Sequence, residues 1–179
     1  MSDLLGLNEE KETTGNDSTT PSGFDPAWEA TAKSGANWFY WIAGLSLVNS
    51  LAFVFGANFS FLAGLGITQV VEALIVVSIE NGAPSMLKGF AIAFDVVVFG
   101  VFALLGYYAN KLFTVAFVIG IVAYVIDGAL VLAVGSIASA AFHAFALFFI
   151  VRGFLACRNI KKFQQAPPIQ SPPPPPVFG

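Results

Sequence analysis

Long apolar runs without charge dominate the chain from Trp38 onward and restrict what it can fold into. Residues 38–56 contain no charged side chain, and at 1.5 Å per residue they would form a helix about 28 Å long. A transmembrane helix needs about 20 mainly apolar residues to cross the hydrocarbon core. Only 11% of the 179 residues are charged, against about 25% in soluble domains. The sequence therefore predicts an all-α integral membrane protein.

Short polar turns separate the apolar segments and predict a bundle of five transmembrane helices. These helices cover residues 38–56, 61–79, 88–108, 113–134 and 137–156. The second segment is ambiguous, because Gln69 and Glu72 lie near its middle, where an acid costs about 2.5–3.5 kcal/mol of insertion free energy. A spanning helix is favoured for this segment over a re-entrant or interfacial helix, and a four-helix bundle is the alternative.

Two polar tails flank the predicted bundle, which occupies residues 36–157. Residues 1–35 hold seven acids and two lysines and lack the apolar content of a packed core, so we expect a disordered acidic tail. Residues 158–179 begin with basic side chains and continue into a proline-rich stretch. Such a stretch adopts an extended conformation that SH3- or WW-type domains recognise. A stiff disordered tail without a partner is the favoured interpretation.

Basic residues set the expected orientation of the bundle. Four of them lie at or just after the end of the last predicted helix: Arg152, Arg158, Lys161 and Lys162. Because cytoplasmic ends of transmembrane helices are rich in Lys and Arg, we expect the C-terminus in the cytoplasm. The side of the N-terminus depends on whether residues 61–79 cross the membrane. No basic stripe occurs elsewhere in the sequence, so nucleic acid is not an expected partner.

Four ionisable side chains fall inside the predicted helices, where such groups are costly and often mark a functional site. They are Glu72, Asp95, Asp127 and His143, each on a different helix. Counting along each helix places all four about 3–5 Å to the outer side of the helix midpoints. Asn49 lies about 3 Å to the inner side of its own midpoint. The sequence thus predicts one polar layer across the bundle.

Three interpretations fit this layer. Carboxylates beside a histidine can relay protons. A divalent metal such as zinc, manganese or iron can also bind to the four ionisable side chains, Glu72, Asp95, Asp127 and His143. An open position on that metal could activate water, and the protein would then be a membrane hydrolase. The third interpretation is structural. In it, Asp127 and His143 pair to hold the last hairpin, while the other two acids stay protonated and hydrogen-bonded.

We expect a small multi-pass membrane protein without enzymatic activity, either a structural or assembly component or a pathway for protons or ions. A metal-dependent intramembrane enzyme is the alternative. The sequence contains no GxSxG, HExxH or GxxxxGK(S/T) motif that would identify an enzyme class. The lipid bilayer is the expected partner. Small residues spaced four apart on the last two helices leave a homo-oligomer as a further alternative.

Overall fold

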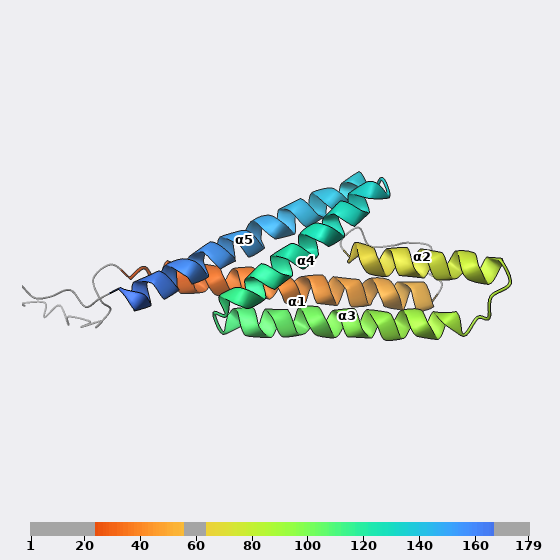
Figure 1. Cartoon of the computed structure of the whole chain (residues 1–179), viewed down its shortest axis with the longest axis horizontal. Coiled ribbons are helices and arrows are strands. Elements are labelled where there is room, and N and C mark those ends of the chain that lie inside the picture. The colour runs from red at the N-terminus through yellow and green to blue at the C-terminus, as the bar shows by residue number, and fades with distance from the viewer. Residues whose placement is uncertain (1–23, 56–63, 167–179) are drawn as a thin grey trace, which may run out of the picture.

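The computed structural model describes residues 24–55 and 64–166, which form five α-helices and no strand (Figure 1). The helices are α1 (Ala27–Val54), α2 (Gly66–Glu80), α3 (Leu87–Asn110), α4 (Thr114–Ala133) and α5 (Ile137–Gln165). α1 packs against α3 and α5, α4 packs against α5, and α2 lies against α3 and α4. The prediction of an all-α fold with five helices is confirmed.

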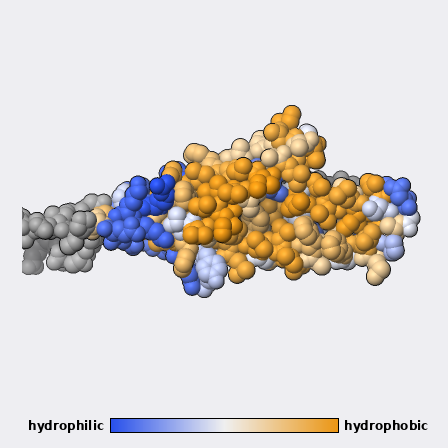
Figure 2. All heavy atoms as spheres, viewed as in Figure 1, coloured by the Kyte–Doolittle hydropathy of each residue, from blue (hydrophilic) through white to orange (hydrophobic). Residues whose placement is uncertain are grey.

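Three of the five helices are long and apolar enough to cross a membrane, namely α3, α4 and α5. α2 has only 15 residues, about 22 Å of helix against a hydrocarbon core of about 30 Å. α1 has 28 residues, but polar side chains such as Asn37 and Asn49 lower its mean hydropathy. Figure 2 shows a hydrophobic surface between hydrophilic ends. A bundle of five membrane-spanning helices is therefore not confirmed.

Helices α1 and α5 extend beyond their predicted ends into segments predicted as tails. α1 begins at Ala27, so its first nine residues fall within the segment predicted to be disordered up to residue 35. α5 continues to Gln165, nine residues past its predicted end. Residues 1–23 and 167–179, which include most of the acidic tail and the proline-rich stretch, lie outside the described residues.

The extended ends of α1 and α5 are helical because they pack against each other. Gly35 of α1 faces Gly153 of α5 where the two backbones touch. A Cβ atom added to Gly35 would lie 2.6 Å from Gly153 Cα, and one added to Gly153 would lie 2.7 Å from Gly35 Cα. Ala32 and Ala36 of α1 are completely buried. Small residues at such contacts let helix backbones approach closely in lipid.

Replacing Gly35 with leucine is expected to lower the free energy of unfolding by about 1–3 kcal/mol, because neither backbone can yield to the added side chain. Gly44→Leu is the matched control, since Gly44 lies in the same helix and an added Cβ meets nothing within 4 Å. Unfolding in mixed dodecyl maltoside and SDS micelles measures both variants. Equal stability of the two would contradict the close approach of α1 and α5.

Helices α1 and α2 run in the same direction, although they are consecutive in the sequence (Figure 1). α1 is antiparallel to α3, with Tyr40 beside Gly106, and α2 is also antiparallel to α3. Gly64, two residues before α2, lies against Asn49, more than one helical turn before the end of α1. α2 consequently starts inside the bundle.

The two ends of the bundle differ in the segments that they contain (Figure 1). The start of α1, the α3–α4 turn and the end of α5 lie at one end, which we call the terminal end. The ring of Phe24 contacts the ring of Phe163 there, with centroids 5.5 Å apart. The α2–α3 and α4–α5 turns point the opposite way, toward what we call the hairpin end.

Candidate functional site

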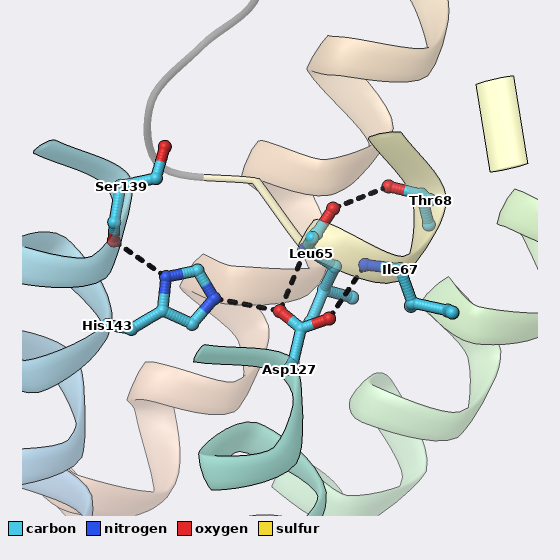
Figure 3. A network of polar contacts seen from close by, with 7 residues as sticks. Leu65, Ile67, Thr68, Asp127, Ser139 and His143 are labelled. Atoms are coloured by element: carbon cyan, nitrogen blue, oxygen red, sulfur yellow. Dashed lines mark hydrogen bonds and ion pairs between the residues drawn. The ribbon is translucent and has the colours of Figure 1, made fainter. Parts of the chain in front are cut away.

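Asp127 of α4 lies at the start of α2 and binds the first two backbone amides of that helix (Figure 3). Gly66 N–H donates to Asp127 Oδ2 and Ile67 N–H donates to Asp127 Oδ1, both at 2.8 Å. The first amides of a helix have no partner within it, and the helix start carries a partial positive charge. Asp127 is only 5% exposed, so its carboxyl group supplies acceptors that water cannot.

His143 of α5 completes this group of contacts (Figure 3). Its Nε2 lies 2.7 Å from Asp127 Oδ2, and its Nδ1 lies 2.7 Å from the carbonyl oxygen of Ser139. A carbonyl oxygen only accepts, so Nδ1 carries a proton and donates it. One further proton lies between Nε2 and Oδ2, and the pair has no net charge whichever atom holds it. A neutral pair with its polar atoms satisfied is suited to an apolar interior.

The start of α2 fits against α4 only because its first residue is a glycine. A Cβ atom on Gly66 would overlap the side chain of Val131 and lie 3.2 Å from the carbonyl oxygen of Asp127. Leu65, just before the helix, is extended and buried. Asp127 lies six residues before the end of α4, about 9 Å along the helix. The start of α2 therefore lies inside the bundle, about 9 Å from the end of α4.

Glu72 of α2 and Asp95 of α3 form a second buried pair. Glu72 is 9% exposed and Asp95 is 3% exposed. The Glu72 carboxyl group lies within hydrogen-bonding reach of Asp95 and of the Ser50 hydroxyl group of α1. Apart from this contact between the two carboxyl groups, neither Asp95 oxygen nor Glu72 Oε1 has a hydrogen-bond donor among the described residues. Two carboxyl groups can bond to each other only when at least one is protonated, because an ionised carboxylate has no donor.

The four ionisable residues predicted to share one layer thus divide into two pairs. Glu72 is five residues beyond Ile67, about 8 Å along α2 from the amides that Asp127 holds. No group of three or more His, Cys, Asp or Glu side chains in the described ranges is arranged to hold a metal ion. The structure thus does not bring the four predicted ligands into one group, and a metal site built on them stays a prediction: Glu72, Asp95, Asp127 and His143.

The inclination of the helices explains why the predicted layer separates. Helices α4 and α5 are inclined to α1 and α3 (Figure 1), so equal residue counts from a turn do not give equal depths. α2 also begins at Gly66 rather than at residue 61, which places its start beside Asp127. Neither the inclination nor the position of this start has a signal in the sequence.

Several groups that contact the two buried pairs were not predicted from the sequence. The amides of α2 and the carbonyl oxygen of Ser139 belong to the backbone, which leaves no sequence signal. Ser50 follows Asn49 directly, and this polar pair within an apolar helix is a signal that could have indicated it. Asn49 itself lies at Gly64 near the start of α2. The ring of Tyr124 stacks on His143 with centroids 4.5 Å apart.

A cavity of about 360 Å³ lies between α2, α3 and α4. Its lining is apolar except for Asp127, and both oxygens of that carboxyl group are already bound by the α2 amides and His143. Among the described residues, the lining therefore holds no unengaged nucleophile or general base.

No protein-family model, curated protein sequence or solved structure matches this chain. The fold itself defines a class: an all-helical protein with three candidate membrane-spanning helices and two buried polar pairs.

Proposed function

We propose that the chain is an integral membrane protein with four spanning helices and one half-length helix. The apolar length of α3, α4 and α5 supports three of the spans. The length of α1 and its antiparallel packing against α3 support the fourth. α2 is parallel to α1 and begins inside the bundle, so it enters and leaves on one side. Such a re-entrant helix is tolerated where protein buries its backbone, and Asp127 binds its first amides.

Both ends of the described chain face the cytoplasm in this arrangement. The start of α1 and the end of α5 share the terminal end of the bundle (Figure 1). The bases at the end of α5 favour the cytoplasm for that end. Because four helices span, the acidic tail that precedes α1 lies on the same side.

We further propose that the bundle carries protons and does not catalyse a chemical reaction. The observation that carries this proposal is the unequal satisfaction of the two buried pairs. Asp127 and His143 have hydrogen-bond partners at their oxygen and nitrogen atoms, as expected of buried structural groups. Three oxygens of Glu72 and Asp95 have no donor in the described part of the chain other than the paired carboxyl group. Carboxyl groups inside a membrane without a cationic partner are typical of proton relays.

A purely structural role for Glu72 and Asp95 is the competing proposal. It requires the two carboxyl groups to hold α2 against α3 by a shared proton, a contact that in membranes contributes about 0.6–2 kcal/mol. Among the described residues, the ion pairs are Lys33–Glu29 and His143–Asp127, so no basic side chain balances a charge on either acid. A pair that changes its proton content is therefore the proposal that we favour.

Proton flux into liposomes tests the proposed pathway. Purified protein is reconstituted with a pH-sensitive dye inside the vesicles, and a potassium diffusion potential drives protons inward. We expect flux through the wild type, and flux at the level of protein-free liposomes for Glu72→Gln and Asp95→Asn. Glu80→Gln is the matched control, because Glu80 is an exposed acid at the end of the same helix. Wild-type flux no greater than that of protein-free liposomes would refute the pathway.

A further inference from the structure

Four basic side chains gather at the terminal end of the bundle, where the α3–α4 turn meets the end of α5. We call them the basic rim: Lys111, Arg158, Lys161 and Lys162. Three of the four are exposed, and Lys161 is half-buried. The hydrophilic surface over the end of α5 borders the hydrophobic belt of the molecule (Figure 2). The basic rim thus lies where apolar surface gives way to polar surface.

Contacts between distant segments bring Lys111 close to the bases of α5. Leu112 adopts a positive φ of 61°, which makes the α3–α4 turn tight. The Cys157 thiol of α5 donates to the carbonyl oxygen of Leu112 at 3.2 Å, across 45 residues of sequence. Thr114 Oγ1 lies 3.8 Å from the same sulfur. These contacts fix the α3–α4 turn against the last turns of α5.

Aromatic rings connect the cations of the two segments. Lys111 Nζ lies 4.3 Å from the ring centroid of Tyr107, and Lys161 Nζ lies 6.0 Å from that of Phe113. The ring of Tyr108 lies between those of Tyr107 and Phe113, with its centroid 5.4 Å from the Tyr107 centroid and 5.8 Å from the Phe113 centroid. Cations are attracted to ring faces at such distances. Aromatic side chains beside basic ones are typical of the membrane–water boundary.

The charge of the basic rim is not balanced by the described acids. None of its four side chains forms an ion pair with a described carboxylate. Of the acids near the start of α1, Glu29 pairs with Lys33 at 2.7 Å and Asp25 accepts the Ala27 amide at 2.8 Å. A hydrogen bond to the Tyr107 side chain raises the pKa of Lys111 above its ordinary value, which favours the cationic form.

We propose that the basic rim binds the anionic headgroup of a membrane phospholipid. Charge complementarity and position both favour this partner, because the rim is cationic and lies at the edge of the apolar belt, where headgroups lie. The aromatic rings between Lys111 and Lys161 provide the contact surface for the lipid below its phosphate. The inference uses the proposed insertion in a membrane, but it does not depend on proton transport.

Lipid titration by native mass spectrometry tests this site in protein purified in dodecyl maltoside. Dioleoyl phosphatidylglycerol is added to one sample and dioleoyl phosphatidylcholine to another. We expect tighter binding of the anionic lipid, weakened by added salt. Each of Lys111→Gln and Lys161→Gln should weaken it about fivefold, as one base near an anionic surface contributes. Lys88→Gln is the matched control, since Lys88 is near the start of α3, far from the terminal end.

Three results would overturn the proposal. The first is equal affinity for the two lipids, and the second is an equal effect of Lys88→Gln and Lys111→Gln on the anionic lipid. The third is competition by inorganic phosphate at the same concentration as the lipid, which would mean a site for free anions. Failure of proton flux leaves all three readouts unchanged, so the two proposals fail independently.

Discussion

Replacing Asp127 with alanine is expected to lower the free energy of unfolding by about 3–5 kcal/mol, the cost of removing one partner of a buried ionisable pair. The substitution leaves His143 without its partner and leaves the amides of Gly66 and Ile67 without acceptors. Each unsatisfied buried donor costs about 1–3 kcal/mol. Unfolding in mixed dodecyl maltoside and SDS micelles measures the loss.

Two further variants show whether the loss comes from these hydrogen bonds. In Asp127→Asn, the new side-chain amide can accept a backbone N–H through its oxygen and donate through its nitrogen to a neutral His143. The loss for this variant should therefore be smaller, about 1–2 kcal/mol. Glu80→Ala removes an exposed acid at the other end of α2 and should change stability by no more than about 0.5 kcal/mol. An Asp127→Ala loss no larger than that of Glu80→Ala would show that other contacts hold the start of α2.

The existence of the helices could be read from the sequence because each apolar run ends at a local signal. Residues 88–108 and 113–134 were predicted within two residues of the bounds of α3 and α4. The ends of α1 and α5 could not be predicted in the same way. They depend on the contact between Gly35 and Gly153, which joins segments far apart in the sequence and has no local pattern.

Part of the candidate site could also be predicted, because two of its residues lie on either side of one short turn. Asp127 and His143 lie eight residues before and eight after the turn at Gly135, so a hairpin brings them level, and the structure pairs them. The position of Glu72 depends on where α2 begins. That start is set by the fit of Gly66 against α4, and no local pattern of apolar residues indicates it.

The two buried pairs differ in a way that separates stability from function. The Asp127–His143 pair satisfies the start of a helix that would otherwise leave amides buried without acceptors, so the fold depends on it. The Glu72–Asp95 pair satisfies no backbone group that the structure describes, and three of its own oxygens have no described donor outside the pair. A pair of the second kind is expected to weaken the fold, and in the proposed function it is kept for proton transfer.

Replacing the second pair by apolar residues, in the double variant Glu72→Met and Asp95→Leu, is accordingly expected to raise the free energy of unfolding by about 1–4 kcal/mol. The apolar side chains remove the cost of burying two carboxyl groups and occupy similar volume. The same variant should lose proton flux. Unfolding in mixed micelles and flux in liposomes measure the two effects on one preparation.

The corresponding double variant of the first pair, Asp127→Leu and His143→Leu, provides the comparison. It should be destabilised, because the amides of α2 lose their acceptor even though no charge is left unpaired. Opposite changes in the free energy of unfolding for the two double variants would mean that the Asp127–His143 pair stabilises the fold and the Glu72–Asp95 pair does not. If the Glu72 and Asp95 double variant were also destabilised and kept the proton flux of the wild type, that pair would be a packing contact, and no proton pathway would run through it.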